Sequence, residues 1–181
     1  GQWGVVSSVG AQQGVDENRA LHDCWSPVLI ASQKGHPEVV SMLLALDGVE
    51  VNQASTIGLP APFVASQEGY AEVVSKLLAK QGVDVNKADN DGWTPLYIAS
   101  QEGHSEVVSL LLAKQGVDVN QAMNDGATPL FIASQNGHSE VVSMLLAKQG
   151  IDVNQAENDG CTPLFIASHN GHSEVVSMLL A

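Results

Sequence analysis

The sequence predicts an all-α repeat protein, a solenoid of stacked helix–turn–helix units with projecting hairpin-like loops. The stretch from Gly92 to Ser100 recurs as Gly126 to Ser134 and again as Gly160 to Ser168, at the same spacing each time. The residues between these copies recur as well. A repeat of this length is typical of a solenoid, in which each unit buries its apolar face against its neighbours.

The period divides a single domain, 1–181, into a degenerate half repeat and five repeats. The half repeat covers 1–20, and the repeats cover about 21–54, 55–88, 89–122, 123–156 and 157–181. Shifted by two periods, the stretch Val5-Val6-Ser7 falls on Val73-Val74-Ser75. Residues 2–12 are therefore expected to form a weak first helix, because Gly4 and Gly10 stand where helix-forming residues are preferred.

Each repeat is expected to contain two helices. Thr94 and Pro95 mark the start of the first, because a threonine hydroxyl caps early amides and proline is tolerated at the first helical position. Gly103 ends this helix, and His104 begins the second. Lys114 is expected to act at the C-terminus of that second helix, where a positive charge is favourable.

A loop is expected to follow each second helix. Gly116 supplies a left-handed stop, and Val-Asp-Val-Asn is typical of an extended segment. The dipeptide Asp125-Gly126 indicates a tight turn between extended arms. Each unit is therefore predicted to be two antiparallel helices with a projecting hairpin-like loop.

The composition supports a hydrophobic core and excludes some classes of partner. Apolar residues make up 44% of the chain, while 7 Lys and Arg against 20 Asp and Glu give a net charge of −13. This charge opposes nucleic acid, whose phosphates are bound by basic residues, and gives no attraction to anionic membranes. No apolar run approaches the roughly 20 residues of a membrane span. The expected partner is a protein with a basic surface.

The two cysteines indicate a reducing environment. Cys24 and Cys161 are separated by four repeat periods and one further position. With stacked helices roughly 8–10 Å apart, they are too distant for a disulfide. Free thiols are typical of the cytoplasm or another reducing intracellular compartment.

The histidines do not indicate catalysis, a cofactor or a metal site. His36, His104, His138 and His172 recur at the repeat period, with Tyr70 once in place of histidine. A step of about 10 Å per repeat is too long for them to share one ion, and they are interpreted as helix-start residues making local hydrogen bonds. His169 and His172 are a local pair that no cysteine or acid completes. No nucleophile and base are brought together by the pattern. The chain is expected to be non-enzymatic, with no cofactor and no metal.

The unit resembles the ankyrin repeat. The family pattern Gly-x-Thr-Pro-Leu-His-x-Ala, then Gly-His, a Val/Leu-rich helix and Asp-Val-Asn, is similar to Gly126 through Asn154, and the resemblance covers essentially the whole chain. The unit here is one residue longer than the family's common length of about 33. The histidine after Thr-Pro-Leu is replaced by Tyr97, Phe131 and Phe165, for which ring packing is the expected substitute for a hydrogen-bond network.

Repeat two departs from the pattern most strongly. The run Gly58-Leu59-Pro60-Ala61-Pro62 replaces Gly-x-Thr-Pro-Leu, so the threonine is lost and the prolines are displaced. The first helix of this repeat is therefore expected to be shifted or distorted.

The resemblance implies a protein-binding module that uses loop tips and the exposed side of the first helices as a concave groove. Positions that vary between repeats three to five fall there, with sequence drift as the alternative explanation. Asp91, Asp125 and Asp159 form an acidic ladder suited to a basic partner. The candidate partner-binding residues are Trp25, Leu59, Asp91, Trp93, Gln101, Glu102, Met123, Asp125, Gln135, Asn136, Asp159, Cys161, His169 and Asn170.

Trp25, Leu59 and Trp93 occupy equivalent positions in three successive repeats, where equivalent means separated by one repeat period or a multiple of it. Stacking lines them up at the junction of loop and first helix. They form either a partly exposed anchor patch or a row half-buried between neighbouring loops.

Two alternatives remain from the sequence. The chain is either a binding module or a spacer or end-to-end self-assembling segment of a longer array, because its ends lack polar caps and Val175, Leu179 and Leu180 present an apolar face. The Asn of each Val-Asp-Val-Asn turn, which reads Val-Glu-Val-Asn at 49–52 and Ile-Asp-Val-Asn at 151–154, follows a leucine by eight residues. The resemblance implies that an Asn in this arrangement is a substrate of an asparaginyl hydroxylase. The other interpretation is that this Asn bonds the loop backbone. These residues are Asn52, Asn86, Asn120 and Asn154.

Overall fold

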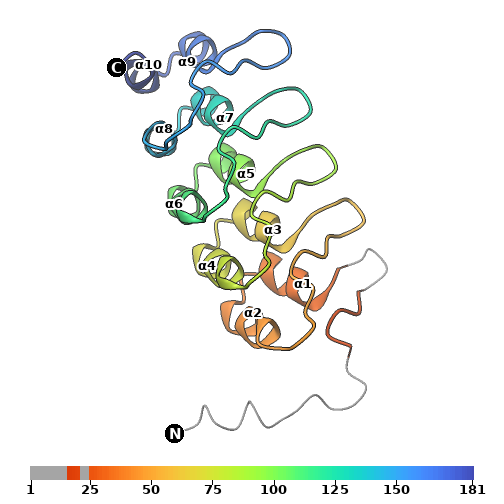
Figure 1. Ribbon diagram of the computed structural model, residues 1–181. Coiled ribbons are helices and arrows are strands. Elements are labelled where there is room, and N and C mark those ends of the chain that lie inside the picture. The colour runs from red at the N-terminus through yellow and green to blue at the C-terminus, as the bar shows by residue number, and fades with distance from the viewer. Residues whose placement is uncertain (1–15, 21–24) are drawn as a thin grey trace, which may run out of the picture.

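The computed structural model describes residues 16–20 and 25–181, and in these residues α-helices stack in pairs without any β-sheet (Figure 1). The first helices of the pairs are α1 (Pro27–Gln33), α3 (Ala61–Gln67), α5 (Pro95–Glu102), α7 (Pro129–Asn136) and α9 (Pro163–Asn170). The second helices are α2 (Pro37–Leu44), α4 (Ala71–Ala79), α6 (Ser105–Ala113), α8 (Ser139–Leu146) and α10 (Ser173–Leu179). Each helix contacts its pair partner and the equivalent helix of the neighbouring pair. The predicted solenoid is confirmed, while the helix predicted for residues 2–12 lies outside the described residues.

The loops between repeats project to one side of the stack, next to the first helices (Figure 1). The loop of repeat three closes as a narrow hairpin, because Asp89 N donates to Trp93 O at 3.1 Å and Gly92 N donates to Asp89 O at 3.3 Å. The next loop repeats this arrangement, with Met123 N donating to Ala127 O at 3.0 Å. The predicted hairpin-like loops are therefore confirmed.

The predicted start and end of the first helices are confirmed in repeats three to five. Thr94 Oγ1 accepts from Tyr97 N at 3.0 Å, and Thr128 and Thr162 make the equivalent bonds. Gly103 follows α5 with φ at 74°, a left-handed conformation that glycine adopts without strain. A threonine hydroxyl at one end and a left-handed glycine at the other thus bound α5, α7 and α9.

The first helix of repeat two is not shifted, so that expectation is wrong. Helix α3 begins at Ala61, which is equivalent to Pro95 at the start of α5. Pro62 is tolerated because the first amides of a helix have no partner within the helix. The loop is held by Ser55, whose N donates to Leu59 O at 3.1 Å and whose Oγ accepts from Leu59 N at 3.2 Å. Ser55 therefore closes this loop with the same two bonds that Asp89 makes to Trp93 in repeat three.

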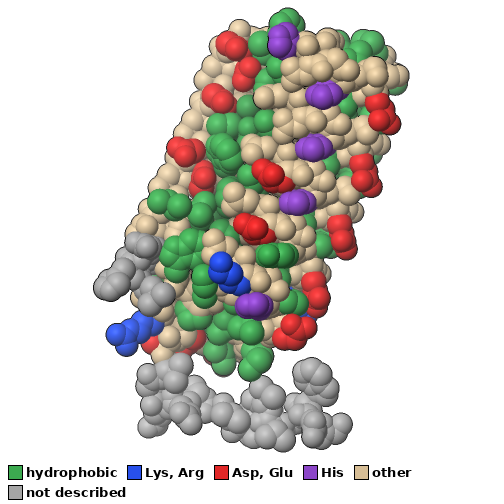
Figure 2. Space-filling view, turned by 180° about the vertical axis from the view of Figure 1, so that it is seen from behind, with side chains coloured by type: hydrophobic (Ala, Val, Ile, Leu, Met, Phe, Trp, Pro, Cys, Tyr) green, Lys and Arg blue, Asp and Glu red, His purple; other side chains and the backbone are tan. Residues whose placement is uncertain are grey.

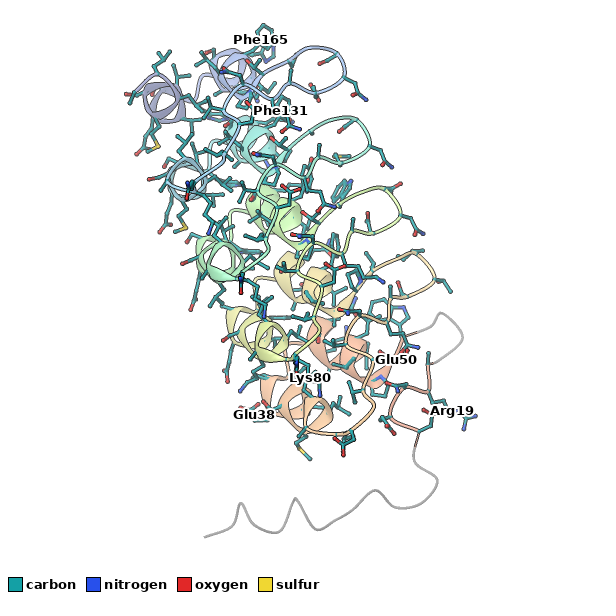
Figure 3. All side chains as sticks on the ribbon, in the orientation of Figure 1. Arg19, Glu38, Glu50, Lys80, Phe131 and Phe165 are labelled. Carbon is teal, nitrogen blue, oxygen red and sulfur yellow. The ribbon has the colours of Figure 1, made fainter. Side chains whose placement is uncertain are left out.

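A continuous hydrophobic core runs through the stack, with residues from both helices of every pair. A second cluster lies where the loops meet the first helices, and it contains Tyr97, Ala127, Phe131 and Ile132 with Trp93 packed against them. The ring packing predicted for Tyr97 and Phe131 is therefore confirmed. Phe165, at the equivalent position in the last repeat, is 56% exposed (Figure 3).

The turn between paired helices packs closely on the next repeat. A Cβ built on Gly103 would lie 2.8 Å from the ring of His138, and Gly69 meets His104 in the same way. These glycines therefore allow the histidine of the following repeat to lie against the turn.

None of the described helices is long and apolar enough to cross a membrane. The longest, α4 and α6, have 9 residues each.

We predict that Gly103→Ala destabilises the protein more than Gly116→Ala. Both glycines have positive φ, at 74° and 86°, so both substitutions carry the left-handed penalty of roughly 1 kcal/mol. Only Gly103 is close to a neighbouring side chain, because nothing lies within 4 Å of a Cβ at Gly116. Urea unfolding of the two variants measures the difference, and equal losses would contradict the close packing of His138 on the turn.

Candidate functional site

The candidate binding residues lie on the projecting loops and on the C-terminal ends of the first helices. Seven of them are exposed: Asp91, Glu102, Asp125, Asn136, Asp159, His169 and Asn170. The others are half-buried: Trp25, Leu59, Trp93, Gln101, Met123, Gln135 and Cys161. The fold thus places all the candidates along one side of the stack.

Hydrogen bonds join the loop tips into one row. Asn124 N donates to Asp91 O at 3.3 Å, and Asn158 N donates to Asp125 O at 2.7 Å. Asp125 Oδ1 also accepts from Ala127 N at 2.9 Å, and Asp159 Oδ1 accepts from Cys161 N at 3.0 Å. The acidic ladder is therefore held at fixed spacing, and two of its carboxylates also brace their own loops.

Trp25, Leu59 and Trp93 pack partly against the main core. The Trp93 ring lies 5.4 Å from the Tyr97 ring, centroid to centroid, at an interplanar angle of 52°. Ala127, at the equivalent position in repeat four, is buried. The sequence left two interpretations open, a partly exposed anchor patch and a half-buried row. In the structure the three side chains form a half-buried row, and each keeps part of its surface accessible.

The ends of the first helices are linked across repeats. Gln101 O accepts from Asn136 Nδ2 at 2.9 Å and from His138 Nε2 at 2.9 Å. A carbonyl oxygen only accepts, so Nε2 of His138 carries the proton. Gln135 O accepts from Asn170 Nδ2 and His172 Nε2 in the same way.

The histidine interpretation needs correction, because these hydrogen bonds are not local. His104, His138 and His172 each reach the carbonyl of a residue 37 positions earlier, at the end of the preceding first helix. Figure 2 shows the histidines in a row along the stack. Each ring therefore ties the start of a second helix to the preceding repeat.

The Asn of the Val-Asp-Val-Asn turn clamps the next loop. Asn86 Nδ2 donates to Gly116 O at 2.7 Å, and Asn86 Oδ1 accepts from Asp118 N at 2.9 Å. Asn52 and Asn120 make the same pair of bonds to their following loops. The interpretation that this Asn bonds loop backbone is confirmed, but the backbone belongs to the next repeat, which the sequence did not indicate.

The lysine that follows α4, α6 and α8 also acts on the preceding repeat. Lys114 stands at the C-terminus of α6, as the sequence predicted, but its ammonium group bonds to the preceding second helix. Lys114 Nζ donates to Leu78 O at the end of α4, at 2.5 Å, and Lys148 Nζ donates to Leu112 O at 2.6 Å. Lys80 makes the equivalent bond to Leu44 O at 2.6 Å, at the junction of α2 and α4 (Figure 3). The positive charge therefore caps the preceding helix, whose last carbonyls have no partner within the helix.

Burial and nearby acids change the ionisation of Tyr97. Burial raises the pKa of its hydroxyl to about 12, and the negative charges of Asp125 and Glu157 add to the increase. Tyr97 therefore stays neutral beneath the acidic loops over the physiological range.

Glu157, Asp159 and Cys161 bring their possible ligand atoms within 4.8 Å of one another. Partial burial raises the pKa of Glu157, and a hydrogen bond from the Cys161 backbone lowers the pKa of Asp159. The pKa of the Cys161 thiol is raised by desolvation and by Asp159. The cluster is an acidic part of the loop row.

The model for Ankyrin repeats (3 copies) matches residues 28–123 and 115–181 of this chain. No curated protein matches the chain. The family model extends over nearly all the described repeats, including the loops and the first helices that carry the candidate residues.

We predict that Asn86→Ala destabilises the protein by about 1–3 kcal/mol, because it removes two hydrogen bonds to the following loop. Asn154 is the matched control. It occupies the equivalent position but is exposed and has no following loop in the described chain. Asn154→Ala is expected to change the free energy of unfolding by less than about 0.5 kcal/mol. Chemical denaturation of both variants tests the clamp, and equal effects would contradict it.

We also predict that Tyr97→Phe flattens the loss of stability at high pH. The pKa of Tyr97 is raised in the folded protein. Its neutral hydroxyl therefore stabilises the fold fully below the pKa of the unfolded state, near 10, and this stabilisation is lost between pH 10 and 12. At pH 11 this titration should lower the free energy of unfolding of the native protein by roughly 1.4 kcal/mol, and the variant should not show this loss. Phe131 shows that phenylalanine fits this position.

Thermal or urea unfolding of both proteins at pH 7 and pH 11 measures this difference. Subtracting the two curves removes the lysine titration that they share. An identical pH profile for native protein and variant would show that the Tyr97 hydroxyl titrates normally.

Proposed function

The chain belongs to the ankyrin repeat family, and we propose that it binds a protein or peptide partner along the concave groove formed by its loop tips and first helices. Protein interaction is the general role of these repeats, which are typically non-catalytic. The observation that carries the proposal is the division between constant and variable positions. Asn86, His138 and Lys114 hold neighbouring repeats together and recur nearly unchanged.

The variable positions lie elsewhere, on the loops and the ends of the first helices. Glu102, Asn136 and Asn170 are equivalent to one another and exposed. A second variable set, at the base of the loop tips, is half-buried and consists of Asp89, Met123 and Glu157. A change at these positions leaves the main core intact. The surface is therefore free to differ between repeats, which is what recognition of an irregular partner requires.

The charge of this surface favours a basic partner. Asp91, Asp125 and Asp159 form the loop row, and Glu102 lies on the end of α5. The chain as a whole carries a net charge of −13. Complementary charge accelerates association and excludes acidic competitors, and its effect weakens as salt rises.

The half-buried side chains supply apolar contacts between the charges. Trp25, Leu59 and Trp93 are already held by the core, so little side-chain freedom is lost when a partner covers them. Large, preorganised aromatic side chains are frequent hot spots in protein interfaces. Met123 and Cys161 extend this apolar row towards the C-terminal repeats.

We predict that peptides selected from a random display library against the whole chain are enriched in Lys and Arg. The double variant Asp91→Asn/Asp125→Asn should weaken their binding by about fivefold or more at low salt, and Trp93→Ala should weaken it by about tenfold. Glu106→Gln/Glu140→Gln is the matched control, because it removes two exposed charges from the second helices.

Isothermal titration or fluorescence anisotropy with the selected peptides gives these affinities. Peptides whose affinity depends on Glu106 and Glu140, and not on the loop acids or Trp93, would place the binding surface on the second helices and contradict the proposal.

A second candidate is a spacer or an end-to-end self-assembling segment, for which the supporting observation is apolar exposure at the C-terminal repeat. Phe165 is 56% exposed and Leu180 is 69% exposed. Sedimentation velocity across a range of concentrations separates the two candidates. A monomer at all concentrations argues against self-assembly, and a mass that rises until Leu180→Asp abolishes it favours self-assembly.

A further inference from the structure

The loop tip of repeat two differs in chemistry from the tips of the repeats that follow it. Ile57 stands there, 59% exposed, at the position that is acidic in repeats three to five. Its equivalents are Asp91, Asp125 and Asp159. Leu59, two residues after Ile57, also keeps part of its surface accessible. The row of loop tips therefore changes from apolar to acidic between repeats two and three.

The tip of repeat two is stacked on the next loop in the same way as the acidic tips. A Cβ built on Gly58 would lie 2.8 Å from Asn90 N. At the tip of repeat three, a Cβ built on Gly92 would lie 3.2 Å from Asn124 N. Figure 1 shows these loops one beside another on one side of the stack. Ile57 therefore continues the line of the acidic ladder.

Hydrogen bonds between the tips limit the distance from one tip to the next. Asp91 O accepts from Asn124 N at 3.3 Å. The two residues from Asn124 N to Asp125 O span at most about 7 Å, so the carbonyl oxygens of Asp91 and Asp125 lie no more than about 10 Å apart. Packed helices are also roughly 8–10 Å apart, so the tips follow one another at a step of this size.

Among the regular conformations of a peptide, polyproline II matches this step best. It has three residues per turn and rises about 3.1 Å per residue, so every third side chain lies on one face, about 9 Å further along. In a β-strand, side chains three residues apart point to opposite faces, and those on one face repeat at about 7 Å. An α-helix of ten residues is about 15 Å long and reaches two tips at most. A short polyproline II peptide therefore meets each tip in turn.

We propose that the groove binds a peptide in the polyproline II conformation, with an apolar side chain at Ile57 and basic side chains three, six and nine residues away, at the acidic ladder. The inference rests on the proposed function and adds the order and spacing of the partner's side chains. Complementary charge selects Lys or Arg at the acidic tips. The apolar surface of Ile57 and Leu59 selects an aliphatic or aromatic side chain at the other end. A peptide that is already stiff in this conformation loses little freedom on binding.

Fluorescence anisotropy at low salt with labelled ten-residue peptides tests the spacing. The probe is Leu-Pro-Pro-Lys-Pro-Pro-Lys-Pro-Pro-Lys, made also in reversed order, and the tighter of the two is used. The matched control is Leu-Pro-Pro-Pro-Lys-Pro-Lys-Pro-Lys-Pro, reversed where the probe is reversed. It has the same composition and charge as the probe, but its lysines are two residues apart. The probe should bind the whole chain about tenfold more tightly than the control, because only its lysines meet one acidic tip each.

Ile57→Asp tests the apolar end, and the acidic tips of the other loops show that aspartate fits this position. Replacing the leucine of the probe by lysine gives a four-lysine peptide. The affinity of this peptide relative to the probe should rise about tenfold in Ile57→Asp compared with the native chain, because a fourth acid then faces the fourth lysine. Leu180→Asp is the matched control, since it adds the same charge at an exposed apolar residue outside the groove. There the ratio should change by less than about twofold, because distant charges are screened.

Equal affinity of the probe and its control for the native chain would overturn the proposal, and so would equal changes in Ile57→Asp and Leu180→Asp. Failure of the probe to bind in either order would overturn it as well. The proposed function is judged on a different measurement, the dependence of the library-selected peptides on Asp91, Asp125 and Trp93. If those peptides depend on these residues but show no three-residue spacing, the groove binds peptides and only the register proposed for them is wrong.

Discussion

Helices of seven to nine residues are too short to persist in water alone, because nucleation is unfavourable and each added residue contributes little. The whole structure depends on this constraint. Each helix here is stable only when its apolar face is buried against its pair partner and against the neighbouring repeats. Stability is therefore a property of the interfaces between repeats more than of any one repeat.

The polar bonds between repeats act at the places where the short helices end. Lysine reaches back to the end of the preceding second helix, histidine reaches back to the end of the preceding first helix, and Asn86 reaches forward to the next loop. These bonds fix the spacing of the loops. A rigid row of loops can then carry variable side chains without altering the fold, which links the repeat architecture to recognition.

The fold was largely predictable from the sequence, but the partners of several polar residues were not. Thr94 and Gly103 define helix ends through contacts within a few residues, so their roles follow from local pattern. The partners of His104 and Lys114 lie in the preceding repeat, and an equivalent carbonyl recurs in every repeat. The pattern alone does not distinguish a bond within a repeat from one to its neighbour.

The candidate surface was predictable in position but not in detail. Trp93 is recognisable as a variable, large residue, yet its half-burial against Tyr97 depends on the stacking of the loops. The displaced prolines of repeat two suggested a distorted helix, whereas Ser55 holds the loop and α3 keeps its register. Substitutions that preserve the backbone bonds are thus tolerated even where the motif is lost.

The most direct test of this account is an NMR titration of the isotope-labelled chain with a basic peptide selected against it. The account predicts that the largest shift changes fall on the loop tips around Asp91, Asp125 and Asp159 and on the ends of α5 and α7. Changes concentrated on the outer faces of α4, α6 and α8, with the loops unaffected, would contradict it.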